Sequence, residues 1–359
     1  MRRVAAPLAL VLALTIAACG SGNDANSDST GTAAAGKPVT IRLLTHDSFA
    51  VSDRVLKAFT NDTGITVKVV KAGDAGAMLN QAILTKGKPL GDVLFGVDNT
   101  LLSKALDAGL FETYEPKALA DVASEYRIDP THHATPVDHG EVCVNFDKKA
   151  FADAGNPPPQ TLDDLVDPRL KGTLVVESPA TSSPGLAFLL ATIAKYGDGP
   201  DGWEAYWQKL KANGVKVADG WETAYNGDFS GGSGKGDRPL VVSYASSPPA
   251  EVYYADPQPA DAPTGVSEGT CFRQVELAGI LRGTRHEAAA RRFVDFLVSK
   301  PFQEDIPLQM FVFPVVNGTA LPDVFTKFAA TPADPFDLAP ATIGKSRERW
   351  IQRWTELVG

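Results

Sequence analysis

The chain has 359 residues, of which 44% are hydrophobic, and its formal net charge is −9 at pH 7. It contains no basic run or stripe, so we do not expect a nucleic acid as a partner. The part from Pro38 onward is long enough to form two lobes, and no stretch in it has the length of an apolar membrane span.

The first residues predict export. Arg2 and Arg3 precede the apolar run "LALVLALTIAA", which is too short for a spanning helix, so we interpret residues 1–18 as a signal peptide. The following "LTIAACG" resembles a bacterial lipobox, which implies that Cys19 is acylated and anchors the protein at the outer face of the cell membrane or in the periplasm. The alternative is an ordinary signal peptide. Residues 19–37 are polar and lack aromatic side chains, which predicts a disordered tether.

Strand and helix patterns alternate in the next part of the chain. Apolar runs predict strands at 39–46, 65–73 and 91–98, and apolar residues at helical spacing predict helices within 48–64, 75–87 and 99–112. Asp98 is expected to be the N-cap of the third helix. This alternation is typical of an α/β fold with a parallel sheet and covering helices.

The same alternation continues to the end of the chain. The patterns predict strands at 139–147, 173–178, 215–221, 239–244 and 271–283, with helices at 183–197, 201–214, 286–307 and 346–359. Ser183, Pro184 and Gly185 are expected at positions N-cap, N1 and N2 of the first of these helices. A strand that ends at hydroxyl groups and a helix N-terminus can bind an anion. The alternative is that Ser183 only caps the helix.

Two cysteines remain besides Cys19. Cys143 and Cys271 are an even number in an exported chain, which favours a disulfide. The alternative from the residues alone is a pair of buried free thiols.

Nine segments, in order, resemble the two-lobed periplasmic solute-binding proteins of ABC importers, and within them the thiamine-binding members. Each segment is weak alone, and their number and order carry the resemblance over most of the chain. They are "THDSFA" (45–50), "GDAGAMLNQ" (73–81), "FGVDNTLL" (95–102), "VDHGEVCVNFDK" (137–148), "PATSSPGLAFLL" (179–190), "DGWETAY" (219–225), "VVSYASSP" (241–248), "EGTCFRQVE" (268–276) and "IPLQMFVFPVVN" (306–317).

The resemblance implies a two-lobed periplasmic-binding-protein fold of type II, with a ligand cleft between the lobes. Lobe 1 would contain residues 38–138 and 275–359, and lobe 2 residues 139–274. The chain would cross between lobes near Asp138–Cys143 and Cys271–Glu276. Both cysteines would then lie on neighbouring hinge strands, which strengthens the expectation of a disulfide.

The resemblance also implies the ligand: thiamine, thiamine monophosphate or thiamine diphosphate. An ABC permease and its ATPase would receive it, and we expect a monomer that uses no cofactor and no metal. Aromatic rings attract a cationic ring such as thiazolium, and acidic groups balance its charge. We expect the acids among Asp47, Asp74 and Glu268. The expected ligand-binding residues are Asp47, Asp74, Ala75, Ser182, Ser183, Trp221, Tyr225, Tyr244, Ala245, Ser246, Ser247 and Phe311.

Two other functions stay open. A secreted metal-dependent hydrolase could use some of the five histidines, although no HExxH or GxSxG motif supports it. A ferric-iron or other small-solute binding protein of the same fold is the second, because the pair Tyr253–Tyr254 is similar to the tyrosine pair of iron-binding members. His46 stands where the thiamine-binding members more often have an aromatic residue.

Overall fold

A computed structural model describes residues 39–232 and 234–359. The predicted signal peptide at residues 1–18, the lipidation site Cys19 and the tether at residues 19–37 lie outside the described residues. In the part that is described, no helix combines the length and the apolar character needed to cross a bilayer.

The described residues form one nine-stranded sheet with the order β2-β1-β3-β8-β4-β7-β5-β6, and β9 pairs with β4. Strand pairs at the two ends of this order are parallel, whereas β3–β8, β8–β4 and β4–β7 are antiparallel. The expected parallel pairing is present at both ends of the order, and β4 and β8 join the two parallel groups by antiparallel pairing, which was not predicted. The strands are β1 (Val39–Thr45), β2 (Ile65–Lys71), β3 (Val93–Asp98), β4 (Thr135–Asp147), β5 (Leu174–Glu177), β6 (Lys216–Ala218), β7 (Leu240–Tyr244), β8 (Thr264–Ile280) and β9 (Phe313–Pro314).

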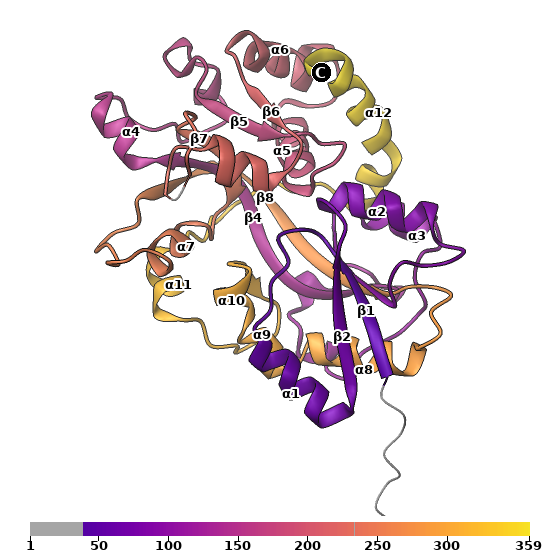
Figure 1. The fold of residues 1–359 in the computed structure, drawn as a ribbon. Helices are drawn as coiled ribbons and strands as arrows, with labels where there is room; N and C mark the ends of the chain where they lie inside the picture. Colours follow the sequence, from indigo (N-terminus) through magenta and orange to yellow (C-terminus); the bar gives the residue numbers. More distant parts are fainter. Residues whose placement is uncertain (1–38, 233) are drawn as a thin grey trace, which may run out of the picture. The chain divides into compact units, whose positions relative to one another are not determined.

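Helices cover the sheet (Figure 1), and each predicted helix overlaps at least one observed helix. In the first helix, the Ser52 side chain accepts a hydrogen bond from the amide of Val55, and Gly64 ends it with a positive φ of 71°. The α-helices are α1 (Asp53–Thr63), α2 (Ala75–Leu84), α3 (Leu102–Asp107), α4 (Lys148–Asp153), α5 (Ser183–Tyr196), α6 (Ala205–Ala212), α7 (Pro248–Tyr253), α8 (Glu287–Leu297), α9 (Lys300–Gln303), α10 (Ile306–Gln309), α11 (Asp323–Phe328) and α12 (Pro340–Val358).

The long helix predicted at residues 286–307 is wrong. It is divided into α8, α9 and α10, because Ser299 adopts an extended backbone and Pro301 and Pro307 each occupy the first turn of a new helix. Proline lacks the amide hydrogen that a continuous helix needs, but fits well at a helix start.

The C-terminal helix α12 packs against both α3 and α6. Its Trp354 makes an edge contact with Trp207 of α6, with ring centroids 5.4 Å apart. The predicted lobe boundaries place α3 in lobe 1 and α6 in lobe 2, so α12 contacts elements of both. These boundaries remain a prediction.

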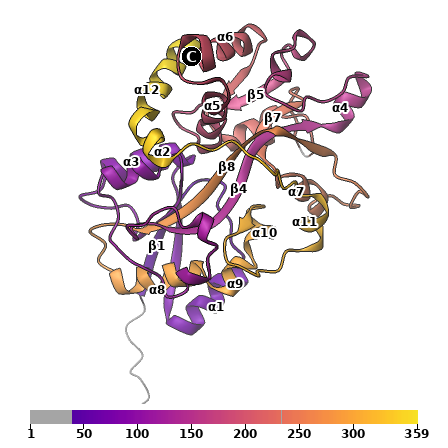
Figure 2. The ribbon, with the colours of Figure 1, turned by 180° about the vertical axis from the view of Figure 1, so that it is seen from behind.

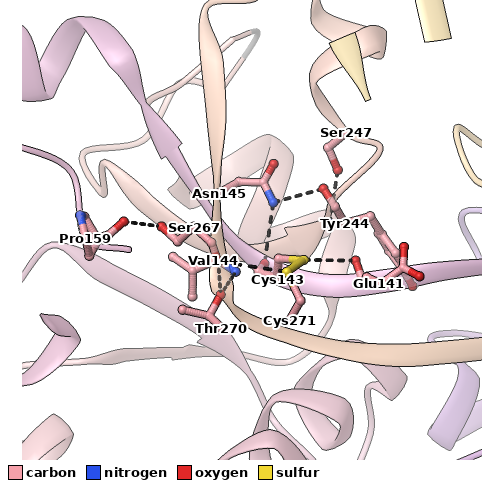
Figure 3. Close-up of a disulfide and its surroundings, with 10 residues drawn as sticks. All are labelled: Glu141, Cys143, Val144, Asn145, Pro159, Tyr244, Ser247, Ser267, Thr270 and Cys271. Atoms are coloured by element: carbon pink, nitrogen blue, oxygen red, sulfur yellow. Dashed lines mark hydrogen bonds between the residues drawn. A yellow bond between two sulfur atoms is a disulfide. The ribbon is translucent and has the colours of Figure 1, made fainter. Parts of the chain in front are cut away.

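Strands β4 and β8 run side by side in both views of the ribbon (Figures 1 and 2). Their pairing is interrupted between Val142 and Val144, where the opposite residues jump from Phe272 to Ser267. A disulfide joins Cys143 and Cys271 at this interruption (Figure 3). The pairing inferred from the resemblance is thus present in the structure, on neighbouring strands.

Candidate functional site

A cavity of about 620 Å³ opens at the ends of several strands, and its volume suits a small organic ligand. Residues of widely separated segments line it. They are His46, Ser48, Asp74, Ala75, Ser183, Pro184, Trp221, Glu222, Tyr225, Asn226, Gly232, Tyr244, Ser247, Ala250, Glu251, Tyr254, Ala255, Asp256, Pro259, Pro263, Glu276, Gln309, Met310, Phe311 and Val312.

One side of the cavity is aromatic. Trp221 follows β6 and stacks on Tyr225 with ring centroids 5.0 Å apart and an interplanar angle of 15°. Tyr244, at the end of β7, meets Trp221 at 61° with centroids 6.4 Å apart. The Trp221 indole donates a hydrogen bond to Ser243 Oγ at 2.9 Å, which fixes its orientation. We name Trp221, Tyr225 and Tyr244 the aromatic wall; all three were predicted to bind ligand.

Asp74 connects the start of α2 to the aromatic wall. Its Oδ1 accepts a hydrogen bond from the amide of Ala75 at 2.6 Å, and its Oδ2 accepts one from the amide of Trp221 at 2.9 Å. A side chain at Gly220 would lie 2.9 Å from Asp74 Oδ2, so the close approach of the two loops requires a glycine at this position. Asp74 and Ala75 line the cavity as predicted, but both oxygens of this carboxylate already accept hydrogen bonds within the protein.

The start of α5 differs from the prediction by one residue. Ser182, not Ser183, is the N-cap, and it makes no side-chain capping hydrogen bond. Ser183 is the first helical residue, and its hydroxyl donates to Asp98 Oδ2 and accepts from Gln274 Nε2 at 2.5 Å. Gly185 approaches the carbonyl of Glu177 too closely for a side chain. Ser183 therefore lines the cavity while its hydroxyl is engaged with buried neighbours.

Asp98 is fully buried and does not cap α3 itself. Its Oδ1 accepts hydrogen bonds from the amides of Thr100 and Leu101, within a turn that precedes the helix start at Leu102. Burial raises the pKa of Asp98, and hydrogen bonds from Gln274, Ser183 and Thr100 partly oppose that increase. The N-cap prediction was wrong because the helix starts later than expected.

Four of the predicted ligand-binding residues do not line the cavity. Asp47 is exposed and accepts from the amide of Gly73, which shapes the turn after β2. Ala245 is buried against the disulfide, and the hydroxyl of Ser246 donates to the carbonyl of Phe311 at 2.7 Å. The hydroxyl of Ser182 is buried without a hydrogen-bond partner. Glu268, expected to balance charge, is exposed on β8 and is also absent from the lining.

Ser247 and Phe311 do line the cavity. The Ser247 hydroxyl lies 2.8 Å from Ser243 Oγ. It also accepts a hydrogen bond from the amide of Tyr244, which supports the aromatic wall (Figure 3). Phe311 has a φ of 53°, a left-handed conformation that costs a non-glycine residue energy. The hydrogen bond from Ser246 to its carbonyl helps to hold it there.

The charge of the lining is strongly one-sided. Five carboxylates line it, and no described lining residue is Lys or Arg; His46 is the basic side chain present. The acids are Asp74, Glu222, Glu251, Asp256 and Glu276, of which only Asp74 was predicted. Burial, followed by the charges of nearby acids, raises the pKa of Tyr244. The cavity therefore favours a cationic ligand.

The two tyrosines at the end of α7 differ in their position relative to the cavity. Tyr254 lines the cavity, while Tyr253, its neighbour at the end of α7, does not. Consecutive residues at a helix end project in different directions, and these two rings meet at 76°. Among the described residues, no group of three or more His, Cys, Asp or Glu side chains could hold a metal ion.

The comparisons with known proteins agree with this geometry. Residues 88–329 match the family described as bacterial extracellular solute-binding protein. The Thiamine-binding periplasmic protein of Escherichia coli (strain K12) is 34% identical over 90% of this chain and 94% of that protein. The relatives are solute-binding proteins rather than enzymes.

Solved structures give the same picture. A periplasmic thiamin binding protein matches with a TM-score of 0.77 and 30% identity, over 89% of this chain and 96% of that chain. An iron-bound protein of Pseudomonas aeruginosa matches with a TM-score of 0.70 at 23% identity, over 89% and 99% of the two chains, and supports the fold alone. Together these matches identify the fold as that of type II periplasmic binding proteins.

Proposed function

Because the chain belongs to the family of bacterial extracellular solute-binding proteins, we propose that it captures thiamine and delivers it to an ABC permease driven by a separate ATPase. The observation that carries this proposal is the pairing of an aromatic wall with a carboxylate lining in one cavity. Thiamine combines two flat rings with a fixed positive charge. Stacking on Trp221 or Tyr244 would bury the rings, and the carboxylates would balance the charge.

The proposal extends to the location of the protein. The relatives named above are periplasmic proteins, which supports export of this chain. Acylation of Cys19 would then tether the binding protein to the membrane, close to its permease. Metabolic labelling of cells with a radioactive fatty acid tests the anchor. The wild-type protein should carry the label, and a Cys19→Ser variant should not.

Thiamine monophosphate and diphosphate are also proposed ligands. The starts of α2 and α5 both line the cavity, and helix N-termini favour anionic groups. The carboxylates of the lining act in the opposite direction. We therefore propose thiamine as the preferred form.

Native mass spectrometry of freshly purified protein, followed by calorimetric titration, tests the function. We expect one molecule of thiamine per chain and no chemical change in it after prolonged incubation. Ferric citrate and free ferric ion serve as alternative ligands. Tight iron binding without thiamine binding, or release of a thiamine breakdown product, would refute the proposal.

A further inference from the structure

Three acidic residues stand side by side across the middle of the sheet. Glu276 on β8 pairs directly with Asp98 on β3 and with Asp138 on β4. Paired residues on neighbouring strands project to the same face, so the three side chains share one face of the sheet. We name Asp98, Glu276 and Asp138 the acid row. Asp98 and Asp138 are 0% and 2% exposed, and Glu276 is the member that lines the cavity.

Each neighbour of Glu276 in the row has a different environment. Asp98 accepts hydrogen bonds from Ser183, from Thr100 and, at 2.6 Å, from Gln274. Asp138 has a buried Oδ2 without a hydrogen-bond partner. Burial and then the charge of Glu276 raise the pKa of Asp138 well above its usual range. Burial thus favours the protonated form of Asp138, and a protonated carboxyl group can donate a hydrogen bond to a neighbouring carboxylate such as Glu276.

His46 approaches Glu276 from the cavity side. Its Nε2 lies 3.1 Å from Glu276 Oε1, and both side chains are largely buried. Gly96 makes this position possible, because a side chain there would lie 2.4 Å from the imidazole ring. Burial lowers the pKa of His46, but the charge and hydrogen bond of Glu276 and the charge of Asp74 outweigh it, so the pKa is raised overall. The imidazole thus stays protonated to higher pH.

The group formed by Glu276, His46 and Asp138 carries little net charge when His46 and Asp138 both hold a proton. In that state the group offers a ligand a hydrogen-bond acceptor in a fixed position, and it does not exert a strong negative field. A carboxylate that lies beside a protonated imidazole and a neutral carboxyl group suits the N–H of a neutral amino group better than it suits a permanent cation, which the aromatic wall can accommodate.

We propose that Glu276 binds the amino group on the pyrimidine ring of the ligand, and that His46 and Asp138 are positioning residues that hold its carboxylate. This inference rests on thiamine being the ligand. It assigns the pyrimidine ring to the acid row and leaves the thiazolium ring to the aromatic wall. Glu276 would thus select for ligands with an exocyclic amino group.

A combined change of protein and ligand tests the contact. Thiamine and its 4′-deamino analogue are titrated against the wild-type protein, Glu276→Ala and Glu276→Gln. We expect Glu276→Ala to weaken thiamine binding by about 10- to 100-fold, the range of a hydrogen bond to a charged group. Binding of the deamino analogue should change by less than about threefold, because its partner atom is already missing. Glu276→Gln keeps the shape and an acceptor oxygen, so its loss should be smaller.

Glu222→Gln provides a matched control, because it removes one cavity carboxylate away from the acid row. This variant should bind thiamine and the deamino analogue more weakly by the same factor. If Glu276→Ala weakened the binding of both ligands by the same factor, Glu276 would act only as a general counter-charge and the inference would be overturned. Unchanged binding of thiamine by this variant would also overturn it. Failure of the folded wild-type protein to bind thiamine at all would instead refute the proposed function.

The positioning role predicts a pH profile. The ionisable groups facing Glu276 are His46 from the loop after β1, Asp98 from β3, Asp138 from β4 and Tyr244 from β7. As the pH rises through the raised pKa values of His46 and Asp138, each of the two groups loses its proton and can no longer donate a hydrogen bond to Glu276. The ratio of thiamine affinity to deamino-analogue affinity should fall.

Asp138→Asn keeps a donor beside Glu276 at every pH, so the fall in this ratio should be smaller than in the wild type. A purely structural role for Asp138 would leave the pH profile of the ratio unchanged. An identical profile in Asp138→Asn and wild type would therefore overturn the positioning role.

Discussion

The aromatic wall lines the cavity with all three of its residues, whereas the acid row reaches it only through Glu276, and the two sets are built in opposite ways. Trp221 and Tyr225 lie in a short helical segment after β6 and Tyr244 lies at the end of β7, and the Trp221 ring contacts the other two rings. The acid row consists of single residues from three strands, brought together by strand register. The aromatic wall offers a ligand a large area of ring contact, whereas the acid row offers it one oriented hydrogen-bond acceptor, Glu276. A ligand with one flat charged ring and one amino-substituted ring would use both.

The largest expected effect concerns the aromatic wall. Trp221→Ala and Tyr244→Ala should each weaken thiamine binding by about 5- to 150-fold, or about 1–3 kcal/mol, through lost stacking and cation attraction. Calorimetry on the two variants measures the loss. Tyr253→Ala is the control, since this tyrosine lies outside the cavity lining. Unchanged affinity in both wall variants would assign the rings to packing alone.

The second prediction separates two adjacent hydroxyls. Ser183→Ala removes a hydrogen bond to the buried Asp98, so it should lower the free energy of unfolding by about 1–3 kcal/mol. Ser182→Ala should cause no loss, because the Ser182 hydroxyl is buried without a partner. Urea denaturation of both variants measures the difference. Equal stability of the two variants would contradict the hydrogen-bonding pattern around the acid row.

The smallest expected effect concerns ligand charge. Thiamine diphosphate should bind about tenfold more weakly than thiamine, because its phosphates enter a cavity with several carboxylates and no lysine or arginine among the described lining residues. Competition titrations at low and high salt measure this, and the difference should shrink as salt screens the charges. Tighter binding of the diphosphate would mean that the starts of α2 and α5 dominate the site.

Local signals predicted most of the elements but not their arrangement. The hydroxyl at Ser52 and the glycine at Gly64 marked both ends of α1, and they act as expected. The antiparallel insertion of β4 and β8 has no local signature, because strand direction depends on how distant segments pair. Pro301 and Pro307 are local signals for breaks in the helix predicted at 286–307. The prediction followed the apolar periodicity of the segment instead and therefore missed the breaks.

The same limit applies to the candidate site. The residues of the aromatic wall were predictable from the matching segments, but the helical segment that carries Trp221 and Tyr225 was not. Glu276 was named only as the end of a hinge segment. Its role depends on register with residues 98 and 138, which no spacing in the sequence encodes. Ala245 and Ser246 lay within a matching segment, yet the backbone there turns them toward the disulfide and the loop of Phe311.

The disulfide has a mechanical consequence. Cys143 and Cys271 are linked where the hydrogen-bonded ladder between β4 and β8 is interrupted, 128 residues apart in sequence. Near this point the hydroxyl of Thr270 accepts a hydrogen bond from the amide of Val144 (Figure 3). A covalent link at a gap in the ladder prevents the two strands from sliding along each other but leaves them free to bend. An oxidising compartment is needed to form the link, so the chain acquires this stiffness only after it leaves the cytosol.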